Sequence, residues 1–128
     1  MPLNFIPRRF ASRTVVTTLF AALAVLLLPR LALAHAHLLS STPAASATVH
    51  GPKVAIELRY NSRVDGQRST LTLVMPDSST KQLTLDSQSG PANLNAHATL
   101  QPGSYTIRWQ ALATDGHITR GEIPFTVQ

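Results

Sequence analysis

Residues 101–111 read QPGSYTIRWQA, and this stretch decides the fold class. Its Pro-Gly pair is typical of a turn. The residues that follow alternate between apolar and polar side chains, which is the pattern of a strand with one face against a core. The inward face of this strand is formed by Tyr105, Ile107, Trp109 and Ala111. We therefore predict a β-strand here, with its tryptophan packed in the core rather than used for binding.

The same period of two recurs on both sides of this strand, and a further strand is expected near residues 37–41. No helical pattern interrupts the series after residue 37. About seven strands within roughly 100 residues predict an all-β, seven-stranded Greek-key sandwich of the immunoglobulin or cupredoxin kind. The apolar positions of the other strands are Val54, Ile56, Leu58 and Tyr60, then Leu71, Leu73 and Met75, then Leu83 and Leu85, then Leu94, Ala96, Ala98 and Leu100, and finally Ile123, Phe125 and Val127.

The first 34 residues have the three parts of a secretion signal. Arginines supply a basic start, residues 15–28 supply an apolar run, and residues 32–34 read ALA, which fits the small-residue cleavage pattern. The apolar run is short for a membrane span, which needs about 20 residues. We therefore predict a cleaved signal peptide over residues 1–34 and a mature domain over residues 35–128. The pair Arg8-Arg9 leaves both Sec and Tat export open, and an uncleaved anchor is the alternative.

Cleavage changes what the composition implies. Four of the eleven Lys and Arg residues would leave with the signal, and the remaining seven face six acidic residues, a net charge of +1. A nucleic-acid binder would keep a basic surface, so this class of protein is disfavoured. The chain has no cysteine, which excludes disulfides and thiolate metal sites. We expect a small monomeric domain in the periplasm of a bacterium.

Two short segments carry the candidate chemistry. Cleavage after Ala34 would make His35 the first residue, so that its α-amine and its imidazole form one chelate. Both groups deprotonate readily near neutral pH. The second segment is Asp115-Gly116-His117, in which the two outer side chains would point to one side of an extended backbone. Three nitrogens and one carboxylate oxygen suit the planar geometry of Cu(II).

These residues, taken jointly, resemble the CopC family of periplasmic copper-resistance proteins. The resemblance implies a Greek-key β-sandwich that binds one Cu(II) tightly through His35, Asp115 and His117. It also implies a non-enzymatic role in copper sequestration, transport or resistance, with a membrane copper transporter of the CopD type as a partner. The segments that carry it are His35, residues 38–43 (LLSSTP), 56–60 (IELRY), 103–109 (GSYTIRW) and 115–117 (DGH), followed by Gly121 and residues 125–127 (FTV).

The chain departs from the family pattern at two places. Some members hold Cu(I) in a methionine-rich loop, because soft thioethers select Cu(I). The predicted mature chain keeps only Met75, so we expect no Cu(I) site of that kind. Some members also place an acidic residue after the strand that ends here at Tyr60. This chain has Ser62 and Arg63 there and Asp65 a little later, so the sequence leaves open whether this region supplies a carboxylate as a fourth or axial ligand.

Three alternatives remain from the sequence. His37 could complete a terminal X-X-His motif, in which the amine, two deprotonated backbone amides and one imidazole wrap the metal. The amine-imidazole chelate also resembles the histidine brace of copper monooxygenases, and a metal-free structural sandwich is the third reading. His50 and His97 are expected to be solvent-exposed and not ligands.

Overall fold

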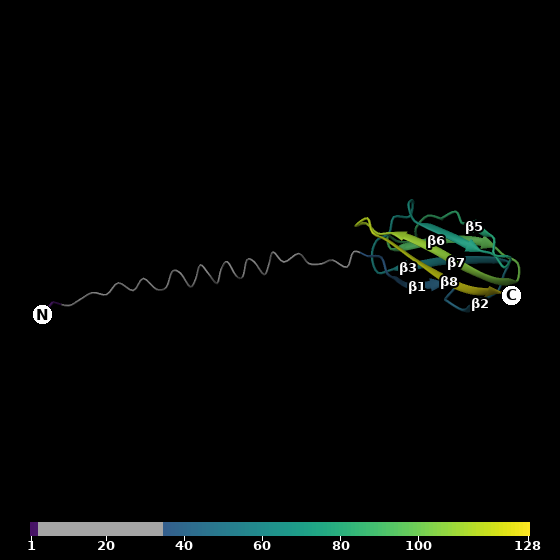
Figure 1. Cartoon of the computed structure of the whole chain (residues 1–128), viewed down its shortest axis with the longest axis horizontal. Helices are drawn as coiled ribbons and strands as arrows, with labels where there is room; N and C mark the ends of the chain where they lie inside the picture. Colours follow the sequence, from purple (N-terminus) through teal and green to yellow (C-terminus); the bar gives the residue numbers. More distant parts are fainter. Residues whose placement is uncertain (3–34) are drawn as a thin grey trace. The chain divides into compact units, whose positions relative to one another are not determined.

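The computed structural model describes Met1, Pro2 and residues 35–128. The predicted signal peptide therefore lies, but for its first two residues, outside the described part of the chain. Residues 35–128 form eight β-strands and no helix (Figure 1). The strands are β1 (Leu38–Thr42), β2 (Ala47–Val49), β3 (Lys53–Tyr60), β4 (Thr70–Val74), β5 (Thr80–Gln82), β6 (Asn93–Thr99), β7 (Gly103–Leu112) and β8 (Ile118–Val127).

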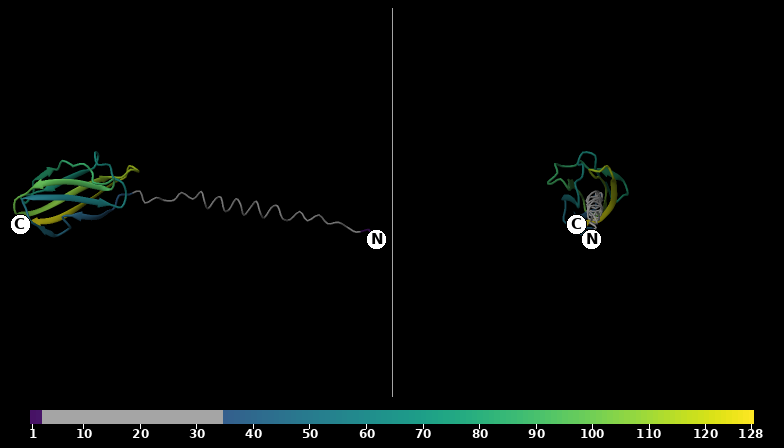
Figure 2. Two further views of the ribbon diagram at one scale, coloured as in Figure 1. Left: turned by 180° about the vertical axis from the view of Figure 1, so that it is seen from behind. Right: turned by 90° about the vertical axis from the view of Figure 1, so that its left-hand side faces the viewer.

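The strands make two sheets that pack face to face (Figure 2). One sheet has the order β1-β3-β6, and the other has the order β2-β8-β7-β4-β5. All neighbours are antiparallel except β2 and β8, which run parallel. The chain crosses between the sheets five times, whereas β4 with β5 and β7 with β8 are antiparallel neighbours within one sheet. The all-β sandwich predicted from the sequence is confirmed.

Alternation decides which side chains enter the core. Every second residue of β3 is buried and the residues between them are exposed. In β7 the four predicted inward positions are also buried, including Trp109, which is 8% exposed. The indole of Trp109 meets the ring of Tyr60 edge-on, at a centroid distance of 5.4 Å. This aromatic pair joins the two sheets, since Tyr60 belongs to β3 and Trp109 to β7.

The structure differs from the sequence prediction in the number and limits of its strands. The eighth strand is β2, whose three residues pair with the end of β8 and are too few to establish an alternating pattern. The strand expected around Leu83 and Leu85 was misplaced, because β5 spans Thr80–Gln82 and both leucines lie beyond its end. Leu83 is nevertheless buried, and its N–H donates to the carbonyl of Leu71. Burial of a leucine therefore continues past the point where regular strand pairing ends.

The strand arrangement brings two distant parts of the sequence to one end of the sandwich. The turn between β7 and β8 and the start of β1 both lie at that end, and the C-terminus lies at the other (Figures 1 and 2). Strand β8 begins at Ile118, directly after the predicted ligand His117. Within the described residues, no helix is long and apolar enough to cross a membrane.

Candidate metal centre

A tight turn between β7 and β8 presents Asp115 and His117. The N–H of Ala113 donates to the carbonyl of His117 at 2.9 Å, and the N–H of Gly116 donates to the carbonyl of Ala113 at 3.0 Å. Gly116 adopts φ of +86°, a conformation that other residues rarely take. The glycine between the two candidate ligands is therefore required by the backbone of the turn.

The carboxylate of Asp115 is bound twice by His117. Its Oδ1 accepts the backbone N–H of His117 at 3.0 Å, and its Oδ2 lies 2.7 Å from the ring Nδ1. The first of these bonds, then the ring contact and the nearby imidazoles of His117 and His35, hold the pKa of Asp115 below its ordinary value. A carboxylate that stays ionised in weak acid is suited to bind a cation. With the proton on Nδ1, the lone pair on Nε2 of His117 is free for a metal.

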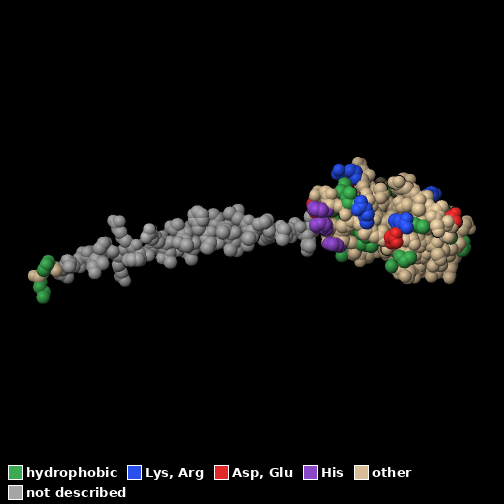
Figure 3. Space-filling view, in the orientation of Figure 1, with side chains coloured by type: hydrophobic (Ala, Val, Ile, Leu, Met, Phe, Trp, Pro, Cys, Tyr) green, Lys and Arg blue, Asp and Glu red, His purple; other side chains and the backbone are tan. Residues whose placement is uncertain are grey.

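The segment that contains His35 is fixed against this turn. The hydroxyl of Thr119 donates to the carbonyl of Ala36 at 2.7 Å, and Ala36 is fully buried. The ring centroids of His35 and His117 lie 4.3 Å apart, although the two residues are far apart in the sequence. Figure 3 shows histidine side chains gathered at this end of the sandwich. The fold thus brings together all three ligands predicted from the sequence.

His37 lies beside this group, and its backbone is engaged elsewhere. Its N–H donates to Oδ1 of Asn61 at 2.8 Å, and the N–H of Asn61 donates to the carbonyl of His37 at 3.0 Å. The X-X-His mode requires this same amide to lose its proton and bind the metal, so the mode would break the Asn61 contact. Nothing in the sequence pairs Asn61 with the segment before β1, so this contact is visible only in the folded chain. The ring of His37 is 6.4 Å from that of His35, centroid to centroid.

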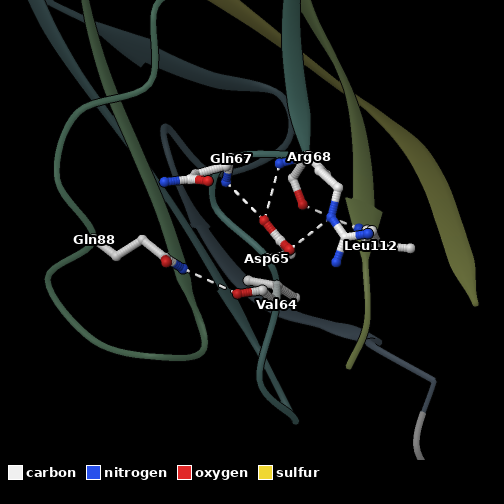
Figure 4. A network of polar contacts seen from close by, with 7 residues as sticks. Val64, Asp65, Gln67, Arg68, Gln88 and Leu112 are labelled. Atoms are coloured by element: carbon white, nitrogen blue, oxygen red, sulfur yellow. Dashed lines mark hydrogen bonds and ion pairs between the residues drawn. The ribbon is translucent and has the colours of Figure 1, made fainter. Parts of the chain in front are cut away.

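Both carboxylate oxygens of Asp65 are engaged within its own loop. Its two oxygens accept the backbone N–H groups of Gln67 and Arg68 and the guanidinium of Arg68 (Figure 4). These bonds, the one to the Arg68 side chain above all, keep the pKa of Asp65 below its ordinary value. The backbone of this loop also supports the candidate centre, because Val64 pairs with Ala113 at the start of the turn. The role of Asp65 is therefore to shape a loop.

The remaining histidines lie away from this end. His97 is paired in register with Ala55, near the start of β3, whereas the candidate centre lies beyond the end of that strand. Its Nδ1 is 2.9 Å from Oδ2 of Asp86, and 77% of its side chain is exposed. His50 is also exposed and precedes Gly51, which bonds to the C-terminal residue. Both are solvent-exposed, as the sequence predicted.

The side chains of the described residues are not arranged as the ligands of a bound metal ion. Among residues 35–128, no three histidine or acidic side chains converge as ligands of one ion. Two features account for this. Both oxygens of Asp115 are held by His117, and the nitrogen of His35 is a peptide nitrogen as long as residue 34 precedes it. For His35, Asp115 and His117 to bind one ion together, the nitrogen of His35 would have to be freed and these side chains would have to turn toward the ion.

The fold and this end of the molecule together define a class: a small two-sheet β-sandwich with histidines and one carboxylate gathered where the first strand meets the last hairpin. The family model described as the CopC domain matches residues 38–128. The chain therefore belongs to the CopC family.

Similar proteins agree with this assignment. Copper resistance protein C of Pseudomonas syringae pv. tomato is 32% identical over 126 residues, which cover 91% of this chain and 98% of that protein. Protein YobA of Escherichia coli is 32% identical over 106 residues, which cover 74% of this chain and 80% of that protein.

Two solved structures have the same fold. CopC from Methylosinus trichosporium OB3b matches with a TM-score of 0.65 and 26% identity, over 73% of this chain and 94% of the other. PcoC, a methionine-rich copper resistance protein from Escherichia coli, matches with a TM-score of 0.62 and 27% identity, over 74% of this chain and all of the other.

Proposed function

We propose that this protein binds one Cu(II) per chain in the periplasm, through the α-amine and imidazole of His35, the carboxylate of Asp115 and the imidazole of His117. Copper is its cargo, which it sequesters or carries and so confers resistance. The observation that supports this most directly is the 4.3 Å approach of the His35 and His117 rings, with the carboxylate of Asp115 against one of them.

The donor types favour Cu(II) over other common metals. Nitrogen ligands with one carboxylate oxygen suit a tetragonal Cu(II) ion, and Cu(II) stands highest among the divalent metals of the first row in raw affinity. The α-amine is the missing fourth donor, and removal of residues 1–34 would create it. Processing at Ala34 is then a step in building the site.

A carrier role fits the site better than catalysis does. Asp115 would occupy a place in the copper plane that an oxygen-activating enzyme has to keep open. The family relatives support a copper cargo, since the Pseudomonas and Escherichia proteins are named for copper resistance. Met75 is the only methionine among residues 35–128, and one thioether cannot form a methionine-rich Cu(I) site. The proposed cargo is therefore Cu(II). A membrane copper transporter of the CopD type is the proposed partner.

The proposal is tested with protein that begins at His35. Cu(II) is titrated against a competing chelator, first with this protein and then with protein carrying one added alanine before His35 and with His117→Ala. Both changes are expected to weaken binding by at least about 100-fold, since loss of even an outer-shell partner costs about 10–100-fold.

His97→Ala is the matched control, because His97 makes a comparable exposed contact with an aspartate but lies at a different place in the fold. Its Cu(II) affinity should equal that of the unmodified protein. Full affinity in the His117→Ala protein would show that the X-X-His mode through His37 binds the metal instead.

A further inference from the structure

We propose that the same end of the domain has a second mode of metal binding, in which the imidazoles of His35, His37 and His117 hold Zn²⁺ and the α-amine takes no part. This inference rests on the proposed function for the roles of His35 and His117, and it adds the use of His37. It differs from the X-X-His mode because no backbone amide is deprotonated.

The ring spacing fits a tetrahedral ion. With Zn–N bonds of about 2.0–2.1 Å, a ring centroid lies about 3.1 Å from the metal, and two imidazoles at a tetrahedral angle have centroids about 5 Å apart. The two measured distances lie on either side of this value. His35 is 4.3 Å from His117 and 6.4 Å from His37. The ring of His35 thus has a histidine ring at about this spacing on either hand, and the exposed side chains would have to turn to bring all three rings around one ion.

The backbone already holds two of these histidines toward one side. His35 and His37 flank Ala36, which is fully buried, while both histidines are exposed. The hydroxyl of Thr119 fixes the carbonyl of Ala36, and the side chain of Asn61 fixes the N–H of His37. Both histidines are therefore presented to solvent, and the ring of His35 lies against His117 of the β7–β8 turn.

This arrangement does not depend on the α-amine. In the described chain residue 34 still precedes His35, so its nitrogen is in a peptide bond, yet its ring already lies against that of His117. The approach of the rings is thus a property of the folded backbone. Cu(II) in the proposed planar site needs the free amine, whereas three imidazoles can hold a metal before or after processing.

Asp115 would play a different part in each mode. Its Oδ2 lies 2.7 Å from Nδ1 of His117, which is the arrangement of a carboxylate that orients a zinc-binding histidine through its second nitrogen. In the zinc mode Asp115 keeps this contact and Nε2 binds the ion. In the copper mode its carboxylate turns to the metal. Zn²⁺ suits the first arrangement because it imposes no planar geometry and takes three protein nitrogens with an open fourth position.

The test compares Zn²⁺ and Cu(II) in the same set of proteins. Each metal is titrated, by competition with a chromophoric chelator, into protein that begins at His35, protein with one added alanine before His35, and His37→Ala. The added alanine is expected to leave the Zn²⁺ affinity within about threefold while it lowers the Cu(II) affinity at least 100-fold. His37→Ala is expected to do the reverse, lowering the Zn²⁺ affinity at least tenfold and leaving the Cu(II) affinity within threefold.

His50→Ala and His97→Ala are the controls for adventitious binding to surface histidines, and both should bind Zn²⁺ as the unmodified protein does. Zn²⁺ affinity that is unchanged by His37→Ala, or that falls when the amine is blocked, would overturn the second mode. Cu(II) affinity that is unchanged by blocking the amine would instead overturn the proposed planar site and leave the zinc mode standing.

Discussion

Gly121→Ala is expected to destabilise the domain by about 1–3 kcal/mol, the range measured when extra methyl groups are forced into packed cores. Gly121 lies opposite Trp109 in the register of β7 and β8. A Cβ added at Gly121 would lie 2.5 to 2.8 Å from three atoms of the indole. Carbon atoms in contact prefer about 3.5–4.0 Å, so the overlap is about 1 Å. The indole is rigid and meets Tyr60 across the core, so relief requires movement of an aromatic pair that joins both sheets.

Urea unfolding followed by far-ultraviolet circular dichroism measures this change, and fluorescence reports on the same site because Trp109 is the only tryptophan in the sequence. The melting temperature should fall by about 4–8 °C for each kcal/mol lost. Gly90→Ala is the matched control: a Cβ there meets nothing closer than 3.7 Å. Its stability should lie within about 0.5 kcal/mol of the unmodified protein, as for most surface changes. A Gly121→Ala protein as stable as the Gly90→Ala protein would refute the close packing inferred for Trp109.

Three further outcomes are expected. Thr119→Val removes the hydroxyl that binds the buried segment at Ala36, so it should cost about 1 kcal/mol in urea unfolding and weaken Cu(II) binding, whereas Thr119→Ser should retain both properties. Tyr105→Phe removes the hydrogen bond to a carbonyl four residues earlier, and its cost of about 0.5–1.5 kcal/mol should appear in urea unfolding with no change in copper affinity. Hydrogen bonds from Arg68 and neighbouring amides lower the pKa of Asp65 in the folded protein from its ordinary 3.8. Ionised Asp65 therefore stabilises the fold above pH 3.8, and this stabilisation is lost as the pH falls through the lower pKa of the folded state. Asp65→Asn should therefore make stability depend less on pH in strong acid, and urea midpoints that fall as steeply with pH as those of the unmodified protein would contradict this.

Most of the sandwich followed from the spacing of apolar residues. Alternation in residues 53–60 and 103–112 predicted the buried face of β3 and β7 residue by residue, because a strand exposes and buries alternate side chains. The short strand β2 could not be predicted in this way. It owes its position to pairing with the end of β8, and such pairing is a property of the assembled sheet. The end of β5 at Gln82 was not predicted either: Leu83 lies outside the strand, although it is buried and its N–H still donates to Leu71 of β4.

For the candidate centre, too, the residues could be predicted from the sequence but the contacts that hold them could not. The DGH segment and a histidine after a cleavage pattern carry their chemistry in the residue types alone, so His35, Asp115 and His117 could be named before the fold was known. The contacts of Asn61 with His37 and of Thr119 with Ala36 join residues distant in sequence, and neither side chain has a distinctive pattern around it.

The all-β class, the buried faces of most strands and the identities of the predicted ligands could be inferred from the residues alone, because these depend on local periodicity and on the chemistry of single side chains. The folded chain was needed to see that the segment at His35 and the turn at His117 meet at one end of the sandwich, that the carboxylate of Asp65 is engaged within its own loop, and that the ring of His37 lies 6.4 Å from that of His35. These relations depend on contacts between residues distant in sequence: β1 and β8 belong to different sheets, and the hydroxyl of Thr119 joins the start of β8 to the carbonyl of Ala36.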